Sequence, residues 1–577
     1  MAPDPGSVGP STSVAPPTSG PAARTFANPV LPGTHPDPSI CRVAGATRAD
    51  GTVAPDDYYL VTSTFEYFPG LPVFHSHDLV TWTQVGHAIH RTGQVDLSSV
   101  PSSGGLYAAT IRHHAGTFFV VTTLVHTQGQ GGHLLVTATD PAGPWSDPVW
   151  LEGDGIDPSL FVDDSTGRVW FTATRLADPG EWEGQTEVWL RELDLAAGAL
   201  VGPEHVLWRG ALHGAVWAEG PHLYRVGDHY YLLASEGGTE HRHAVSVARA
   251  DAVTGPYTGN PANPILTHRH LGRDFPVVGV GHADLVETAA GEWWMVLLGS
   301  RPYGGYFPNL GRETFLAPVV WEDGWPVVAP GRGHVAGSFP LPDVGAQVQE
   351  AGAPAEVGRP VGVGDVVVRE TFDGSPNEGL DLAWNQVRTG EPSWSLTERP
   401  GHLRLALSPA TLSDVATPAF LGRRQQHTDM DLTVRVDVDP AGPDEWAGLA
   451  VRQSEEAWIA AVVTRAAPGA AGVPGGRELL VVERVGGEEN VVGRAALGPL
   501  GLAEGPADVA LHAAGQDYAF GVETPGGFAP VATVHGGRLS SPEAGGFLGV
   551  WVGPYATARG TATATVADVE SVEYRGR

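Results

Sequence analysis

The amino-acid sequence predicts an all-β protein, with a five-bladed β-propeller followed by a β-sandwich. Its 577 residues include 77 glycines and 49 prolines, which is typical of many short strands joined by turns. A short β pattern recurs five times within roughly the first 335 residues. Beyond about residue 366, apolar and polar residues alternate without that repeat, and no stretch of useful length has a helical period.

The repeat consists of a turn, two aromatic or bulky residues, and then an apolar β run. It recurs every 51 to 63 residues, a spacing typical of one four-stranded propeller blade. Five copies therefore predict five blades. The copies are Asp57–Val61, Thr117–Val121, Arg168–Phe171, His229–Leu233 and Glu292–Val296.

Composition divides the chain into four segments. Residues 1–24 are rich in Pro, Ser, Gly and Ala, and we expect a disordered tail and not a signal peptide. Residues 25–337 contain the repeats and are the expected propeller. Residues 338–365 have little periodicity and are the expected linker. Residues 366–577 contain alternating runs, which predict two antiparallel sheets packed face to face.

Charge and residue usage exclude several classes of function. The formal net charge is −31 with no compensating basic patch, so we expect neither nucleic acid nor an anionic membrane as a partner. Cys41 is the only cysteine, which excludes an intrachain disulfide or a cysteine metal cluster. The sequence contains no run of about 18 apolar residues, so it predicts no membrane span. We expect a cytoplasmic protein and leave a homo-oligomer open.

A chemically distinctive residue precedes the β pattern in every repeat. The innermost strands of a propeller surround a central channel, so these five positions are expected to converge on one pocket. The marked residues are Asp37, Tyr107, Asp157, Glu219 and His282.

Asp37 stands between two prolines, and Asp157 and Glu219 lie in similar Asp-Pro and Glu-Gly-Pro contexts. One such aspartate is more often a turn residue than a chemical group. Three carboxylates at equivalent repeat positions favour a shared chemical role. Asp37 lies farther from its β run than the others, which we attribute to an inserted loop at 44–55.

Paired carboxylates across a pocket are what glycoside hydrolysis requires. Glu219 is the expected acid, because its long side chain can reach a glycosidic oxygen and Trp217 would desolvate it. Asp37 is the expected base, kept ionised by Arg312. Asp157 would keep the acid protonated and orient it. The competing interpretation is that these acids bind a cation or cap turns.

Aromatic residues in the predicted pocket suit the C–H faces of sugars. Phe65, Tyr107 and Trp217 are the candidates. His282 could be an ordinary core histidine, or could contact a water, the base or a bound Ca²⁺. The histidines of the 241–243 run are expected to be solvated.

Together these stretches resemble glycoside hydrolase family 43 enzymes of the β-xylosidase type. The resemblance spans the predicted propeller, and the C-terminal region fits the family's β-sandwich more loosely. It rests on residues 28–31, 35–42, 62–70, 156–161, 218–222, 281–282, 285–288 and 310–314.

The resemblance implies a five-bladed propeller and hydrolysis with inversion of configuration. It assigns Asp37 as general base, Glu219 as general acid, and Asp157 as the residue that tunes and orients the acid. Arg312 matches an arginine near the base and the sugar. Phe65 matches an aromatic residue that shapes the pocket.

The resemblance also implies that an aromatic residue of the sandwich closes the pocket, for which Phe547 and Trp551 are candidates. Some family members carry Ca²⁺ near the histidine that matches His282, although no cofactor is required. The chain departs from the family pattern at Tyr107, where tryptophan is common, and at Asp284, an additional acid near the axis.

We therefore expect an exo-acting, inverting enzyme that releases D-xylose from β-1,4-xylooligosaccharides. Inversion predicts catalytic carboxyl groups roughly 6.5–9.5 Å apart. An α-L-arabinofuranosidase acting on arabinose-substituted substrates, or an enzyme with both activities, is the alternative. A non-catalytic carbohydrate-binding propeller is a remote third.

Overall fold

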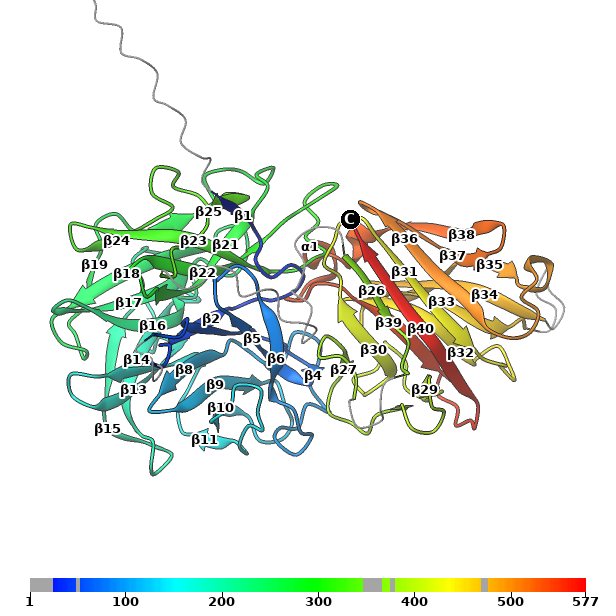
Figure 1. Ribbon diagram of the computed structural model, residues 1–577, viewed down its shortest axis with the longest axis horizontal. Coiled ribbons are helices and arrows are strands. Elements are labelled where there is room, and N and C mark those ends of the chain that lie inside the picture. Colours follow the sequence, from blue (N-terminus) through cyan, green and yellow to red (C-terminus); the bar gives the residue numbers. More distant parts are fainter. Residues whose placement is uncertain (1–23, 48–51, 346–365, 374–378, 468–475) are drawn as a thin grey trace, which may run out of the picture.

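The computed structural model describes residues 24–47, 52–345, 366–373, 379–467 and 476–577. Within these ranges the regular structure is β, apart from one short helix, α1 (Ser541–Ala544), and the 3₁₀ turns η1 (Gly498–Leu500) and η2 (Gly536–Leu539). The predicted all-β class is confirmed, with a five-bladed propeller and a C-terminal sandwich lying side by side (Figure 1). Residues 1–23 of the expected tail and 346–365 of the expected linker lie outside the described residues.

Five antiparallel sheets form the propeller, one for each sequence repeat. Blade 1 contains β2 (Ser39–Val43), β3 (Asp57–Val61), β5 (Gly70–Ser76) and β6 (Thr83–Ile89). Blade 2 contains β7 (Gly105–Leu106), β8 (Thr110–His114), β9 (Thr117–Val125), β10 (Gly132–Ala138) and β11 (Val149–Leu151). Blade 3 contains β12 (Ile156–Asp163), β13 (Arg168–Leu176), β14 (Thr186–Asp194) and β15 (Ala199–Trp208). Blade 4 contains β16 (Glu219–Val226), β17 (His229–Glu236), β18 (Ala244–Ala250), β19 (Thr258–Gly259) and β20 (Leu266–Thr267). Blade 5 contains β21 (Val278–Glu287), β22 (Trp293–Ser300), β23 (Glu313–Glu322) and β24 (Trp325–Val328).

The inner strands of the blades surround the channel. β2, β8, β12, β16 and β21 contact one another from blade to blade, as the repeat predicted. The repeated aromatic and apolar runs lie on the second strand of each blade. Their buried side chains pack between neighbouring sheets, which explains why the pattern recurs once per blade.

A small sheet joins the start of the propeller to its end. β1 (Thr25–Ala27) pairs with β25 (Ser338–Pro340), so the first residues of the expected linker form a strand. Phe26 and Phe339 face each other in this pair, are both buried, and pack beside Trp294 of blade 5. The burial of these aromatic rings anchors both ends of the propeller segment.

In the part of the chain that the structure describes, the sandwich consists of two antiparallel sheets with eight strands each. One sheet contains β26 (Val366–Glu370), β28 (Trp394–Ser395), β29 (Leu403–Ala406), β31 (Met430–Asp437), β36 (Ala507–Ala514), β37 (Asp517–Thr524), β38 (Gly527–His535) and β40 (Val566–Gly576). The other contains β4 (Tyr67–Phe68), β27 (Asn385–Val387), β30 (Ala419–Arg424), β32 (Trp446–Arg452), β33 (Ala457–Arg465), β34 (Arg477–Val485), β35 (Glu488–Ala496) and β39 (Trp551–Thr557).

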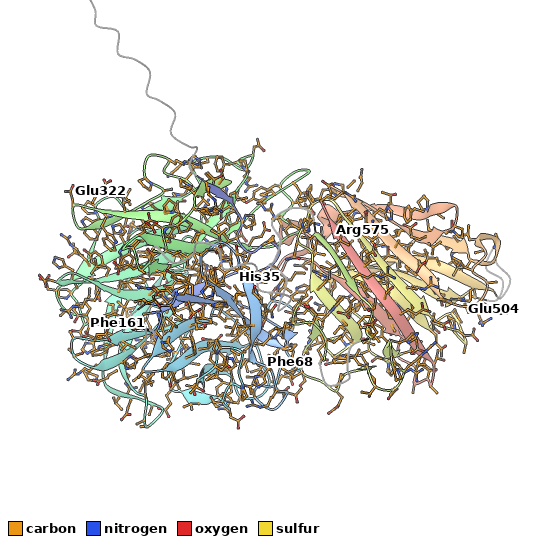
Figure 2. All side chains as sticks on the ribbon, viewed as in Figure 1. His35, Phe68, Phe161, Glu322, Glu504 and Arg575 are labelled. Carbon is orange, nitrogen blue, oxygen red and sulfur yellow. The ribbon has the colours of Figure 1, made fainter. Side chains whose placement is uncertain are left out.

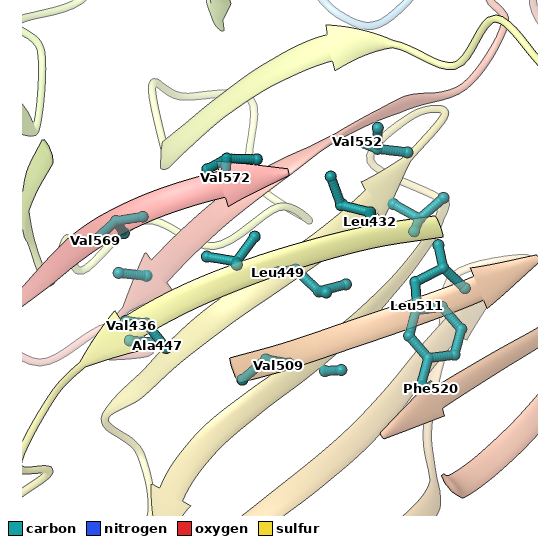
Figure 3. Packing of buried hydrophobic residues seen from close by; sticks show 14 of the residues in the cluster. Leu432, Val436, Ala447, Leu449, Val509, Leu511, Phe520, Val552, Val569 and Val572 are labelled. Atoms are coloured by element: carbon teal, nitrogen blue, oxygen red, sulfur yellow. The ribbon is translucent and has the colours of Figure 1, made fainter. Parts of the chain in front are cut away.

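The sandwich core lies between these sheets. Along β31, residues alternate strictly between buried and partly exposed, as the period of two in the sequence predicted. Leu432 and Val436 of β31 lie in one cluster with Leu449 of β32 and Leu511 of β36, so both sheets contribute to the core (Figure 3).

The two domains share a sheet. β4 belongs to the propeller segment of the chain but pairs with β27 of the sandwich, where Phe68 lies opposite Gln386. Phe68 and His35 both lie where the two halves meet (Figure 2). Because β4 follows Phe65 by two residues, this pairing fixes the loop that carries Phe65. Among the residues that the structure describes, no helix has the length and apolar character needed to cross a bilayer.

Candidate active site

The inner strands of three blades are irregular at their functional residues. The β12–β13 register shifts between Ile156 and Ser159, around Asp157. The β16–β17 register shifts immediately after Glu219, and the β21–β22 register shifts around His282. Such bulges turn a side chain away from the regular alternation of a strand.

Backbone strain accompanies these bulges. Five of the eight predicted site residues have the left-handed conformation that side chains other than glycine rarely adopt. Such residues cost of order 1–3 kcal/mol each and persist where the surrounding structure enforces them, often at functional sites. They are Asp37 (φ 55°), Phe65 (φ 55°), Asp157 (φ 55°), Trp217 (φ 54°) and His282 (φ 45°).

All eight predicted site residues line one cavity of about 430 Å³. The convergence predicted from the repeat is therefore present, although these residues span 275 positions of sequence between Asp37 and Arg312. The eight are Asp37, Phe65, Tyr107, Asp157, Trp217, Glu219, His282 and Arg312.

Asp37 has the surroundings of an ionised carboxylate. Arg312 Nη1 donates to its Oδ1 at 2.9 Å, and Ser63 Oγ donates to its Oδ2 at 2.6 Å. Burial opposes ionisation, but Arg312, then His282 and the Ser63 hydrogen bond, outweigh it and lower the pKa of Asp37 below its ordinary value. An ionised Asp37 can accept a proton from water.

Glu219 has the opposite character. Burial of its carboxyl in the pocket wall, followed by repulsion from Asp157 and Asp37, raises its pKa well above the ordinary value. Asp157 is buried, accepts from Gly220 N–H at 3.1 Å, and has a pKa raised by burial and by Asp37. The same pocket therefore contains one carboxyl group that favours ionisation and one that favours its proton.

Arg312 is held between Asp37 and Thr239. Its Nη1 also donates to Thr239 Oγ1 at 2.9 Å, and its guanidinium lies over the ring of Phe65 at 5.6 Å. Its Nε is buried and has no hydrogen-bond partner among the described residues.

His282 and His243 both lie near Asp37. His282 is 6% exposed, and its Nδ1 lies 3.8 Å from Asp37 Oδ1. The expected solvated position of His243 is wrong, because its ring is fully buried and its Nδ1 contacts the Gly279 carbonyl at 3.1 Å. Burial lowers the pKa of His243 to about 3. The close packing of β18 against β21 excludes water from this ring.

The donors around His282 do not form an oxygen cage. Ca²⁺ takes six to eight oxygen ligands. The described neighbours of His282 supply imidazole nitrogens, the Ser235 hydroxyl, and carboxylates that already bind other groups. These residues alone therefore do not complete a calcium site.

Phe547, from the sandwich, completes the aromatic wall. Its ring stacks on Phe65 with centroids 6.4 Å apart and meets Tyr107 edge-on at 6.5 Å. Its backbone N–H donates to Ser103 Oγ at 2.9 Å, which fixes it to the propeller. The other candidate, Trp551, is 1% exposed and stacks on Tyr67 at 3.9 Å. Phe547 therefore supplies the contribution of the sandwich to the cavity.

Trp217 lies at the mouth of the cavity. Its side chain is 42% exposed, so it shields Glu219 less than the sequence suggested. An exposed indole face beside a pocket suits stacking on a sugar ring that extends outward.

Sequence reasoning missed several residues of the site. Thr239 and Glu240 line the cavity, and Ser63 donates a hydrogen bond to Asp37. Ser63 lies in the quoted 62–70 motif, but no repeat marks Thr239 or Glu240. These two lie on a loop after β17, where the strand period no longer predicts which side chains turn inward.

Asp284 lies near the axis but away from the cavity. It is completely buried, forms an ion pair with Arg112 at 2.8 Å, and accepts from Tyr224 Oη at 2.6 Å. Although burial opposes ionisation, Arg112 lowers its pKa. The additional acid is therefore a neutralised structural residue.

Comparisons with known proteins agree with this geometry. The family model described as "Glycosyl hydrolases family 43" matches residues 26–326. The model "Beta xylosidase C-terminal Concanavalin A-like domain" matches residues 369–575. The two matches cover the propeller and most of the sandwich.

Full-length relatives show the same arrangement. A xylosidase/arabinosidase from Butyrivibrio fibrisolvens is 38% identical over 552 residues, covering 94% of this chain and 97% of its own. A non-reducing end alpha-L-arabinofuranosidase from Bacteroides ovatus is 36% identical over 558 residues, covering 96% and 95%. The crystal structure of xylan beta-1,4-xylosidase from Bacillus halodurans superposes with a TM-score of 0.81 at 32% identity, covering 95% of this chain and 100% of its own.

Proposed function

The chain belongs to glycosyl hydrolase family 43, and from that premise we propose that it releases D-xylose from the ends of β-1,4-xylooligosaccharides with inversion. The observation that carries this proposal is the contrast between Asp37 and Glu219 within one cavity. Asp37 has a lowered pKa and Glu219 a strongly raised one. Glycoside hydrolysis by inversion needs an ionised base and a protonated acid at the same time.

In the proposed reaction, Asp37 accepts a proton from water as the water oxygen attacks the anomeric carbon. The glycosidic C–O bond breaks as Glu219 protonates the departing oxygen. Asp157 raises the pKa of Glu219 and so keeps this acid protonated. Arg312 keeps Asp37 ionised.

The shape of the cavity supports action at chain ends. Phe547 and Phe65 stack on one side of a cavity of about 430 Å³, while Trp217 is exposed at the mouth. A cavity of this size, walled by these aromatic rings, accommodates a terminal sugar, and Trp217 can stack on the following unit. The sugar-facing roles of Tyr107 and His282 belong to the same proposal.

Release of α-L-arabinofuranose, alone or beside xylose, is the alternative. The names of the Butyrivibrio and Bacteroides relatives favour it. Xylopyranose and arabinofuranose present similar hydroxyl groups, so the same three carboxylates serve both reactions. A propeller that only binds carbohydrate is disfavoured, because binding alone needs no acid and base.

One set of assays separates these possibilities. We would compare hydrolysis of 4-nitrophenyl β-D-xylopyranoside, 4-nitrophenyl α-L-arabinofuranoside and xylobiose. Preference for the xyloside and xylobiose supports the proposal, and preference for the arabinofuranoside supports the alternative. A Glu219→Gln variant should lose turnover of xylobiose. If the wild type turns over none of the three, the proposed substrate class is wrong.

Stereochemistry needs a separate measurement. Proton NMR of the first product formed from xylobiose should show the α-anomer of xylose, as inversion requires. Initial appearance of the β-anomer would instead indicate a retaining reaction and carboxyl groups about 5–5.5 Å apart.

No cofactor takes part in this proposal, and Ca²⁺ near His282 stays a prediction. Calorimetric titration of the stripped protein with Ca²⁺ would test it. A cytoplasmic location and a homo-oligomer also stay predictions, for which cell fractionation and light scattering are the measurements.

A further inference from the structure

Two histidines and an aspartate gather on the outer part of blade 1, apart from the cavity. His75 lies on β5 and His77 follows its end, so the two share one face of that strand. Tyr58 pairs with Ser76 in the β3–β5 ladder, which places Asp57 directly opposite His77 and diagonal to His75. The ladder therefore brings the three side chains to one face of the sheet.

The two imidazoles converge on the same carboxylate oxygen. His75 Nε2 lies 2.7 Å from Asp57 Oδ1, and His77 Nδ1 lies 3.3 Å from it. The two rings meet edge to face at 4.6 Å. One potential ligand atom from each of the three residues lies within 4.8 Å of the other two.

We propose that Asp57, His75 and His77 bind a divalent metal ion that prefers imidazole ligands, Zn²⁺ in the first instance. Imidazole and carboxylate together suit Zn²⁺ better than Ca²⁺ or Mg²⁺, which take oxygen ligands. Tetrahedral Zn²⁺ with bonds of 2.0–2.1 Å places its ligand atoms about 3.3 Å apart. The Asp57–His75 and Asp57–His77 separations of 2.7 and 3.3 Å differ from that value by less than about 1 Å. The two histidine nitrogens lie within 4.8 Å of each other, so side-chain rotations bring all three atoms around one ion.

The surroundings of the cluster support binding. The side chains of Asp57, His75 and His77 are 34%, 25% and 48% exposed, so an ion can enter from solvent. Tyr59 packs on the His75 ring at 5.1 Å and limits its rotation. His77 Nδ1 also lies 3.0 Å from the Asp56 carbonyl, a contact that a metal bond to this nitrogen would replace. The net charge of −31 also attracts cations.

The ion would stabilise blade 1 and take no part in hydrolysis. Asp57 is the first residue of β3, and the five-residue strand spans roughly 13 Å before the chain reaches Ser63 and the base. A metal ion bound by Asp57, His75 and His77 would cross-link β3 to β5 at the end remote from the cavity. Binding to the folded state raises its stability by mass action.

Calorimetric titration of the stripped, folded protein with Zn²⁺ tests the proposal. We expect one equivalent to bind to the wild type and the binding to weaken at least about tenfold in His75→Ala and in His77→Ala. The matched control is His229→Ala, which removes one member of an exposed His–Asp pair (Nδ1–Oδ1 2.9 Å) that forms no metal-ligand group with a second histidine of the described chain. Binding to this variant should equal that of the wild type.

Two further readouts distinguish lost ligands from lost folding. Zn²⁺ should raise the Tm of the wild type and of His229→Ala, but not of His77→Ala. Co²⁺ should give a visible absorption band in the wild type that Asp57→Asn and His77→Ala lack. Equal Zn²⁺ stoichiometry in the wild type and in a folded His75→Ala/His77→Ala double variant would overturn the proposal. Xylobiose turnover should not depend on Zn²⁺.

Discussion

Replacing Arg452 by methionine should destabilise the interface between the domains and disturb the cavity at the same time. Arg452, on β32 of the sandwich, is 1% exposed at its side chain and donates to Glu66 Oε1 at 3.1 Å and Tyr67 Oη at 2.9 Å. It also donates to Ser102 Oγ at 2.8 Å and forms an ion pair with Glu455 at 3.2 Å. The guanidinium of Arg452 therefore binds four partners, and three of them belong to the propeller segment.

The expected loss in the free energy of unfolding depends on the charged groups that stay buried without Arg452. Hydrogen bonds to charged groups contribute about 1.5–3 kcal/mol each, but contacts within one network do not add. Removing one partner of a buried ion pair costs about 3–5 kcal/mol, because it leaves an uncompensated charge. Glu66 is fully buried, and its remaining partners are the Ser102 hydroxyl and the Ser103 N–H. We therefore expect a loss of about 3–5 kcal/mol in the free energy of unfolding.

The loss should depend on pH. Burial already raises the pKa of Glu66, and Arg452 is the main group that opposes this shift. Without Arg452 the pKa rises further, so the folded variant retains a proton that the unfolded chain releases as pH rises. Arg452→Met should therefore be destabilised more at alkaline than at mildly acidic pH.

The same substitution should raise KM. Ser103 connects Glu66 to the cavity, because its N–H binds Glu66 Oε2, its carbonyl accepts from Tyr107 Oη, and its hydroxyl accepts from the Phe547 N–H. A displaced Glu66 would therefore loosen two aromatic residues of the wall.

Urea unfolding monitored by tryptophan fluorescence, with KM for xylobiose measured in parallel, would check both effects. The control is Arg91→Met, which breaks an exposed ion pair with Asp147 and a hydrogen bond to the Trp145 carbonyl and should cost about 1–2 kcal/mol. If Arg452→Met loses no more stability than Arg91→Met, the interface does not depend on this network and the reasoning fails.

Three further variants test the cavity itself. Arg312→Met should move the acidic limb of the kcat/KM profile to higher pH, because Arg312 holds the pKa of Asp37 low and ionised Asp37 is the active form; an unmoved limb would contradict this role. Asp157→Asn should move the alkaline limb to lower pH, because Asp157 raises the pKa of Glu219; a shift to higher pH would refute it. Phe547→Ala should raise KM for xylobiose about tenfold, the size of one aromatic contact, and an unchanged KM would exclude contact with the sugar.

Much of the fold followed from local patterns. The repeated aromatic runs predicted five blades because each run must be buried between two sheets. The alternation along β31 predicted a sandwich strand because side chains of a strand point to opposite faces in turn. The sequence contains no such pattern for the pairing between the domains, because β4 pairs with the sandwich strand β27 through two residues, Tyr67 and Phe68.

The residues around the cavity also divide into those that the sequence predicted and those that it did not. Asp37, Asp157 and Glu219 were found because each occupies an equivalent place in a repeat, and a closed ring brings equivalent places together. Thr239 belongs to a loop, where no period indicates the direction of a side chain. His243 was misjudged because its polarity suggested solvent, whereas the packing of β18 against β21 buries it.

The sequence by itself determined the blades and the sandwich and predicted that Asp37, Asp157 and Glu219 converge, because these features depend on periodic burial and on repeated local motifs. Only the tertiary structure decided which aromatic residue of the sandwich reaches the cavity. It also decided how Asp37 and Glu219 acquire opposite pKa shifts, and that Asp57, His75 and His77 face one another. These features depend on distances between residues far apart in the chain, or on adjacent strands whose register closes only when the sheet forms.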